Sequence, residues 1–266
     1  INDEDYAKEI LLRENYFFIM GYRHLFVKHD TTRKFKDGST FEELYSLFVF
    51  DRMFRNIIFK NILIVENNYK SIFSHVLSKD YGYKEKDYLN SKNFDTSKEK
   101  SRQINDLVRK IKRQLRINGK NHGATSHYMD NYGYIPLWIG IKVISFGIMS
   151  EMFSVLKYHN KEEIADIYHI TPEEMEVFLP ILANYRNLCA HEDIVFDHFT
   201  QRVIPDNKYH NLLNIDKTND EYVYGKNDIF ALIIILKFLL TQTDFKMMMN
   251  EINYEFDRLS GKLHTI

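Results

Sequence analysis

The longest regular pattern in the sequence is an apolar repeat between residues 44 and 76, and it constrains the fold more than any other feature. Ser39 and Thr40, each followed three residues later by Glu42 or Glu43, form the capping-box signature of a helix start. After them, apolar side chains recur at spacings typical of one helix face. The repeat consists of Leu44, Leu47, Phe48, Phe54, Ile58, Ile62, Val65, Tyr69, Ile72, Phe73 and Val76. The sequence therefore predicts one long helix that ends near residue 75.

Turn-forming residues are scarce. Only 10 Gly and 4 Pro occur among 266 residues, which disfavours a β-sandwich and favours long helices. We therefore expect an all-α helical bundle with few or no strands. The length allows one large or two small domains. We expect an N-terminal helical region at residues 1–97, which includes the long helix, and a second helical region at residues 98–266.

Several shorter elements are expected along the chain. A helix is predicted at 136–158, and another begins at Thr171 with a capping box. Pro180 lies inside that second helix and is expected to kink it or to start a new one. The segment 30–38 is polar and is expected to be a loop. A loop is also expected at 118–135, which is rich in Gly, Asn and His.

The amino-acid composition indicates the class of protein and the cellular compartment. Hydrophobic residues make up 44% and charged residues 27%, as in soluble globular proteins. Cys189 is the only cysteine, so no internal disulfide can form, and we expect a cytoplasmic location. The apolar run from Ile229 to Leu240 contains a lysine and is too short to span a bilayer, so no membrane partner is expected. The net charge of −1 points to no partner.

Local charge does point to a partner. The segment 98–120 has nine Lys or Arg against two acidic residues, and an apolar stripe at helical spacing runs along it. A basic face on an amphipathic helix is typical of contact with a nucleic-acid backbone. The alternative is a solvated face without a partner. The candidate RNA-binding residues are Arg102, Arg109, Lys112, Arg113, Arg116 and Lys120.

The stretch 183–197 contains a compact set of polar side chains within an apparently helical run. Arg186, Asn187 and His191 form an Arg-Asn-x-x-x-His pattern, and the last two are four residues apart, on one helix face. A guanidinium and an imidazole so close in sequence suit chemistry on a phosphate ester. Cys189, within the pattern, is expected to be a small buried packing residue.

Metal binding and cofactors are not expected. His122 and His127 lie close together in sequence, but neither a cysteine pair nor a His-Glu-x-x-His pattern accompanies them. No glycine-rich phosphate loop is present.

Seven short stretches follow one another along the chain: NYFFIMGY (15–22), GSTFEELY (38–45), FDRMFR (50–55), IVE (64–66), PLW (136–138), SFG (145–147) and RNLCAH (186–191). Through these stretches the chain resembles the Abi-like family of bacterial abortive-infection proteins, the AbiD and AbiF group. Lys142 stands where that family often has an acid, and Glu192 to Asp197 replaces the run that often follows its motif histidine.

The resemblance implies a HEPN-type helical bundle with additional N-terminal helices. In the HEPN superfamily, the Arg-x-x-x-x-His motif marks metal-independent endoribonucleases. The implied partners are a target RNA and, as for some family members, a structured small noncoding RNA. The implied role is toxin-type phage defence, with composite sites across a homodimer.

The chemistry of RNA cleavage agrees with these residues. His191 is expected to act as acid or base on the 2′-hydroxyl reaction, Arg186 to hold the phosphate, and Asn187 to orient either group. One copy supplies one imidazole where an acid and a base are both needed, so we expect a homodimer.

Three alternatives remain open. The chain could be a non-catalytic RNA-binding module in a defence or toxin–antitoxin ribonucleoprotein. It could be a HEPN toxin silenced by nucleotidyl transfer, although Asp193 occupies the position where that group typically has Tyr. In the third, His191 is a core residue with a structural role only.

Overall fold

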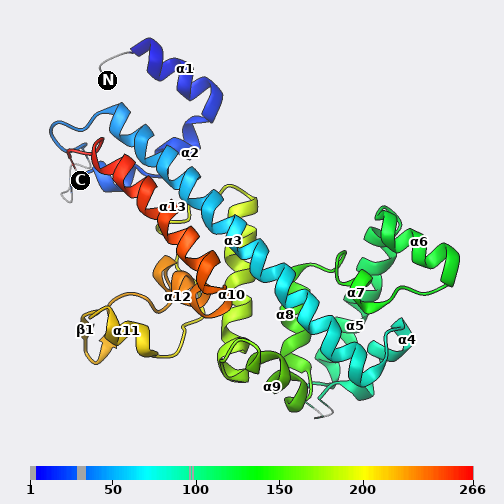
Figure 1. Cartoon of the computed structure of the whole chain (residues 1–266). Helices are drawn as coiled ribbons and strands as arrows, with labels where there is room; N and C mark the ends of the chain where they lie inside the picture. Colours follow the sequence, from blue (N-terminus) through cyan, green and yellow to red (C-terminus); the bar gives the residue numbers. More distant parts are fainter. Residues whose placement is uncertain (1–3, 29–33, 96, 98, 266) are drawn as a thin grey trace. The chain divides into compact units, whose positions relative to one another are not determined.

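The computed structural model describes residues 4–28, 34–95, 97 and 99–265 (Figure 1). The described residues form α-helices labelled α1 to α13 and one sheet of two short strands, which confirms the all-α prediction. They divide into two compact units, each built from several stretches of sequence. A domain boundary at residue 97 stays a prediction.

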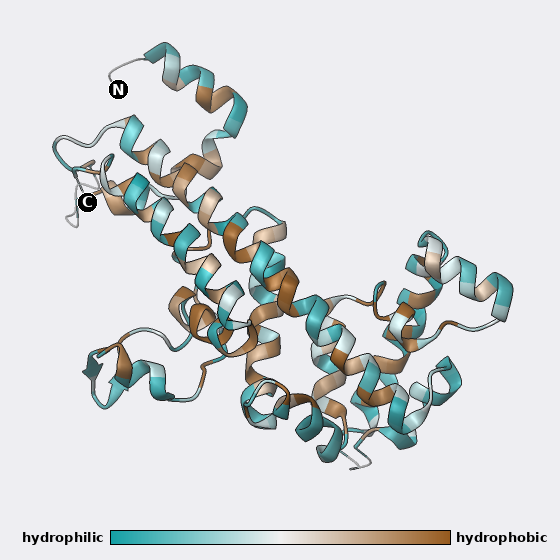
Figure 2. Cartoon of the chain, viewed as in Figure 1, coloured by the Kyte–Doolittle hydropathy of each residue, from teal (hydrophilic) through white to brown (hydrophobic). Residues whose placement is uncertain are grey.

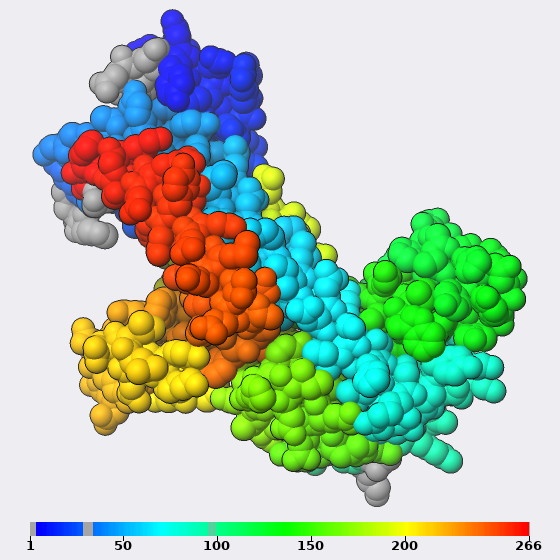
Figure 3. Space-filling model, in the orientation of Figure 1, coloured from blue at the N-terminus to red at the C-terminus, as the bar shows by residue number. Residues whose placement is uncertain are grey.

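The first unit comprises residues 1–61, 188–198 and 241–266. In it, α13 lies against residues 41–61 of α3, as Figure 3 shows in red and blue. Phe50 and Phe256 pack with ring centroids 5.0 Å apart, and Lys60 pairs with Glu251 at 2.6 Å. The elements of this unit are α1 (Glu4–Glu14), α2 (Tyr16–Met20), the 3₁₀ helix η1 (Arg23–Phe26), the first half of α3 (Phe41–Tyr81) and α13 (Gln242–Ser260).

The second unit comprises residues 62–187 and 199–240. Its core includes Tyr69 of α3, whose ring packs against Phe73 of the same helix and against Phe146 and Phe153 of α8. The apolar helix α12 is mostly brown in Figure 2. After the remainder of α3, its elements are α4 (Glu85–Tyr88), η2 (Ser91–Asn93), α5 (Ser101–Gly119), α6 (Gly123–Tyr132), α7 (Leu137–Gly140), α8 (Phe146–Val155), α9 (Tyr158–Asp166), α10 (Pro172–Ala190, to residue 187), α11 (Lys208–Leu212), β1 (Lys217–Thr218), β2 (Glu221–Tyr222) and α12 (Ile229–Leu239).

The predicted helix starts are confirmed. Glu43 N donates to Thr40 Oγ1 at 3.2 Å, and Thr40 N donates to Glu43 Oε2 at 3.1 Å, which completes the capping box of α3. Thr171 and Glu174 make the same reciprocal pair of bonds at the start of α10. The long helix continues to Tyr81, a turn and a half beyond the predicted end.

The loop predicted at 118–135 is wrong, because residues 123–132 form α6. Packing overrides the weak local helix preference there. Thr125 is buried, and a Cβ atom on Gly119 would lie 2.9 Å from Thr125 Cγ2, so α6 approaches the end of α5 closely at a glycine. Gly133, with φ of 70°, then ends α6 in the left-handed region.

The single helix predicted at 136–158 is also wrong, because the chain leaves the helical path at residues 141–145. Backbone groups there bond to side chains of other helices: Lys70 Nζ donates to the Ile144 carbonyl at 3.0 Å, and Ser145 N donates to Gln114 Oε1 at 2.9 Å. Pro180 starts no new helix, since α10 continues through it between buried apolar neighbours. The polar loop predicted at 30–38 lies partly outside the described residues.

Candidate functional site

The Arg-Asn-x-x-x-His motif lies at the end of α10. Arg186 and Asn187 are the last α10 residues of the second unit, whereas His191 belongs to the first unit. The helical run expected through residue 197 is wrong beyond Ala190, so His191 follows the helix directly. His191 and Asn187 are both exposed. An exposed His191 excludes the alternative in which it is a buried core residue.

A tight turn ends the helix beside His191. Glu192 has φ of 60°, in the left-handed region that L-residues rarely adopt. Glu192 N donates to the Cys189 carbonyl at 3.3 Å, and Asp193 N donates to the Leu188 carbonyl at 3.1 Å. These two bonds form a Schellman motif, which usually has glycine where this chain has Glu192. His191 is the capping residue of that motif.

A buried polar cluster of the first unit holds the segment after His191. The Asp51 carboxylate accepts hydrogen bonds from Val195 N at 3.2 Å, Phe196 N at 3.1 Å and the Tyr22 hydroxyl at 2.8 Å. Burial raises the pKa of Asp51, and these donors oppose that shift.

Arg55 completes the cluster from the next turn of α3. Its guanidinium lies 3.5 Å from the Asp51 carboxylate and donates to the Asp193 carbonyl at 3.1 Å. Both charged side chains are almost fully buried. The role of Asp51 and Arg55 in the first unit is therefore to fix the backbone that follows His191.

A second cluster, in the second unit, holds Arg186. Glu66 on α3 is buried, and its carboxylate lies 3.5 Å from Arg186 Nε and 2.8 Å from Lys70 Nζ. Lys70 also donates to the Ile144 carbonyl. The Arg186 side chain is 36% exposed, so an anion can reach it from solvent. We call Glu66, Lys70 and Arg186 the arginine cluster.

A hollow of about 400 Å³ shares Lys70 with the arginine cluster. Trp138 and Lys142 line it, and both side chains are exposed. The Trp138 ring centroid lies 5.6 Å from that of Tyr83. Lysine ammonium groups and an exposed indole ring suit the phosphates and bases of a single-stranded nucleic acid.

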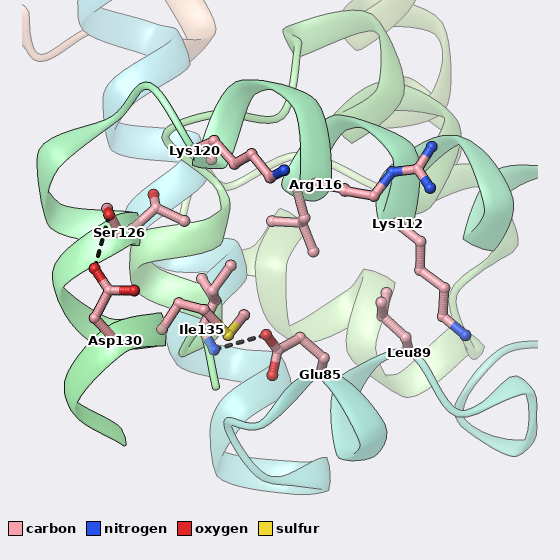
Figure 4. Close-up of a pocket in the computed structure, with 12 residues that line it drawn as sticks. Glu85, Leu89, Lys112, Arg116, Lys120, Ser126, Asp130 and Ile135 are labelled. Carbon is pink, nitrogen blue, oxygen red and sulfur yellow. Dashed lines mark hydrogen bonds between the residues drawn. The ribbon is translucent and has the colours of Figure 1, made fainter. Parts of the chain in front are cut away.

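The predicted RNA-binding residues of α5 are all exposed, including Lys120 just after the helix. Their surroundings in the structure differ. Arg109 pairs with Asp106, three residues before it. Lys112, Arg116 and Lys120 line one cavity of about 390 Å³ (Figure 4). Arg102 and Arg113 do not line it.

Cys189 and His122 are two further residues that the sequence analysis considered for a functional role. Cys189 is buried, as predicted, and burial raises the pKa of its thiol to about 12. His122 Nδ1 lies 3.0 Å from Thr125 Oγ1. The described residues contain no group of three or more His, Cys, Asp or Glu arranged to hold a metal ion. Across the same residues, every helix is too short or too polar to cross a bilayer.

Sequence reasoning missed the residues that position the motif. Asp51 and Arg55 are oppositely charged residues four positions apart on the long helix, and so are Glu66 and Lys70. That spacing was the available signal. It did not reveal their second partners, since Arg186 and the 193–196 segment lie more than a hundred residues further along the chain.

Comparison with known proteins places these residues in a family. The family model described as Abi-like protein matches residues 9–197, which include the motif, the long helix and α5. Searches among curated proteins and among solved structures found no match. Because the matched region covers most of the sequence, the chain belongs to the Abi-like protein family.

Proposed function

We propose that this chain is a HEPN-type, metal-independent endoribonuclease of the AbiD and AbiF group that acts in abortive infection. Membership of the Abi-like family supports the role in phage defence. The chemistry is proposed from Arg186, Asn187 and His191.

The observation that carries the proposal is the arginine cluster. A buried carboxylate with two cations around it holds a solvent-accessible guanidinium in place. Such a fixed guanidinium is suited to bind phosphate oxygens through paired donors. The neighbouring hollow, with Trp138 and Lys142, offers places for a base and a phosphate next to it.

The proposed reaction uses the 2′-hydroxyl of RNA as nucleophile. His191 takes the 2′-hydroxyl proton, the oxygen attacks phosphorus, and the bond to the 5′-oxygen breaks. The leaving 5′-oxygen takes a proton from His191 of the partner subunit in a homodimer. Arg186 stabilises the charge on the phosphorane, and Asn187 orients the imidazole or the phosphate. The products are a 2′,3′-cyclic phosphate and a 5′-hydroxyl.

The test is cleavage of an end-labelled RNA in the presence of a chelator, with analysis of the product ends. We expect cyclic phosphate ends, and no cleavage where the 2′-hydroxyl is replaced by hydrogen. His191→Ala should abolish cleavage, whereas His159→Ala, which removes an exposed histidine of α9, should not. Cleavage that persists at a 2′-deoxy position would contradict the proposed reaction.

A second candidate function is RNA binding without cleavage, with control by a small noncoding RNA. The exposed basic side chains of α5 favour it. In that case RNA that copurifies with the chain would remain bound to Arg186→Ala and His191→Ala variants, and no product ends would form.

A further inference from the structure

We propose that the cavity beside α5 binds a nucleotide, with the phosphate on the basic helix and the base in the apolar interior. The cavity has a volume of about 390 Å³ and is lined by residues of α4, α5 and α6, with Leu89 and Ile135 beside them. Its size is typical of small-molecule sites, which measure roughly 300–1,000 Å³. It shares no lining residue with the arginine cluster.

Three cations identify the phosphate end. Lys112, Arg116 and Lys120 follow each other at intervals of four residues, so they lie on one side of α5. In the described part of the chain, none of the three has an acidic side chain within ion-pair distance, whereas Arg109 pairs with Asp106 and Lys110 with Glu151. Three positive charges along the edge of one cavity favour the binding of an anion there.

The interior of the cavity suits a flat apolar ring. Leu89, Leu115 and Ile135 are buried side chains that contribute to its wall, and Met129, which is 44% exposed, contributes from α6. A thioether and branched aliphatic groups pack well against the face of an aromatic ring. A bare phosphate or sulfate would leave this apolar part of the cavity unused.

Two carboxylates lie across the cavity from Arg116 and Lys120. Figure 4 shows Glu85 and Asp130 on the side away from Arg116 and Lys120. Glu85 Oε1 accepts a hydrogen bond from Ile135 N at 2.6 Å, and Asp130 Oδ2 accepts one from the Ser126 hydroxyl at 3.1 Å. Each carboxylate has a second oxygen that can accept N–H groups from the edge of a base. The order of cations, apolar wall and acceptors matches phosphate, ring and amino edge of a nucleotide such as guanosine monophosphate.

This site goes beyond the proposed cleavage reaction and does not depend on it. The nucleotide can come from two sources: a free nucleotide, or an unpaired nucleotide within a bound RNA. Isothermal titration calorimetry with the full chain distinguishes these two sources. The ligands are guanosine 5′-monophosphate, inorganic phosphate, and a short guanosine-containing RNA with 2′-O-methyl groups, which attack by the 2′-oxygen cannot cleave.

Two variants remove different parts of the site, and a third is the matched control. Arg116→Ala should weaken nucleotide binding about tenfold, as expected when a charge-assisted hydrogen bond is lost. Met129→Trp fills the apolar interior and should weaken binding at least as much. Lys110→Ala removes a cation of the same helix that pairs with Glu151 and does not line the cavity, and it should change the affinity by no more than about twofold.

The outcomes decide both the site and the source. If guanosine monophosphate binds more tightly than phosphate, and Arg116→Ala and Met129→Trp weaken its binding while the control variant does not, the cavity is a site for a free nucleotide. The same pattern with the RNA alone identifies a site for a nucleotide of RNA. If neither guanosine monophosphate nor the RNA binds, or if Arg116→Ala and Lys110→Ala have equal effects, the proposal is overturned. Arg116 is exposed, so its variant should fold even if Met129→Trp does not, which circular dichroism can show.

Discussion

Replacement of Asp51 by Asn tests whether the buried cluster fixes the backbone after His191. Asp51 is fully buried and accepts two backbone N–H groups and the Tyr22 hydroxyl, with Arg55 3.5 Å away. The amide keeps the shape but removes the charge, so Arg55 stays buried without its anionic partner. Breaking a buried ion pair in this way costs about 3–5 kcal/mol.

We expect Asp51→Asn to lower the free energy of unfolding by about 3 kcal/mol, near the bottom of that range, because Arg55 keeps its hydrogen bond to the Asp193 carbonyl. Urea unfolding followed by circular dichroism measures this loss. Hydrogen exchange should accelerate at the Val195 and Phe196 amides. The control is Asp37→Asn, since Asp37 is 95% exposed in its pair with Lys28 and should change stability very little.

The double variant Asp51→Asn/Arg55→Met provides the second half of this test. If the two side chains form one cluster, the double variant should be more stable than the sum of the single losses predicts, by about 1–3 kcal/mol. Additive losses, or a loss for Asp51→Asn no larger than for Asp37→Asn, would show that Asp51 and Arg55 do not form such a cluster.

Three further predictions concern other parts of the chain. Glu66→Gln should lower the RNA cleavage rate while RNA affinity changes little, because the Arg186 guanidinium loses its buried anionic partner. Equal losses in rate and affinity would argue against a positioning role for Glu66. Trp138 is the only tryptophan, so single-stranded RNA should quench the intrinsic fluorescence, and Trp138→Ala should weaken binding about tenfold, as for the loss of one stacked base. Tyr158→Ala, which removes an exposed ring of α9, is the control. Cys189 should react with iodoacetamide at pH 8 about a thousandfold more slowly in the folded than in the unfolded chain, because a thiol pKa of about 12 instead of about 9 lowers the thiolate fraction by that factor.

The raised thiol pKa also predicts how stability depends on pH. The unfolded thiol loses its proton near pH 9, whereas the folded thiol keeps it until about pH 12. The folded state therefore binds more protons in that window, and stability falls as the pH rises through it, by up to about 1.4 kcal/mol per pH unit from this group. Cys189→Ala should remove this part of the slope in urea unfolding measured at pH 8 and pH 10 under reducing conditions. Identical slopes for the two chains would contradict the assignment.

Local patterns in the sequence were enough to predict the helices with strong periodicity and caps. The long helix α3, the basic helix α5 and the start of α10 follow from apolar spacing and capping boxes. The helix α6 was not predicted, because its sequence has little local helix preference; in the structure its Thr125 is buried and packs closely against Gly119 of α5. The end of α10 was missed because Glu192 adopts a conformation normally taken by glycine.

The candidate site was only half accessible to sequence reasoning. The spacing of Arg186 and His191 is visible in the sequence, but the buried carboxylate that holds Arg186 lies on α3, far away along the chain. The basic stripe of α5 was also visible. Only the structure separates the three cations of the cavity from Arg109, which a neighbouring aspartate neutralises.

Arg186 and His191 are proposed to act on the same phosphodiester linkage, and a double-mutant cycle of RNA cleavage rates is the decisive test. We expect Arg186→Ala and His191→Ala each to slow cleavage by at least about a hundredfold. The double variant should be hardly slower than the slower single variant, because the effects of groups that act as a unit are not additive. Single variants that cleave RNA at the rate of the unaltered chain, or losses that multiply in the double variant, would contradict it.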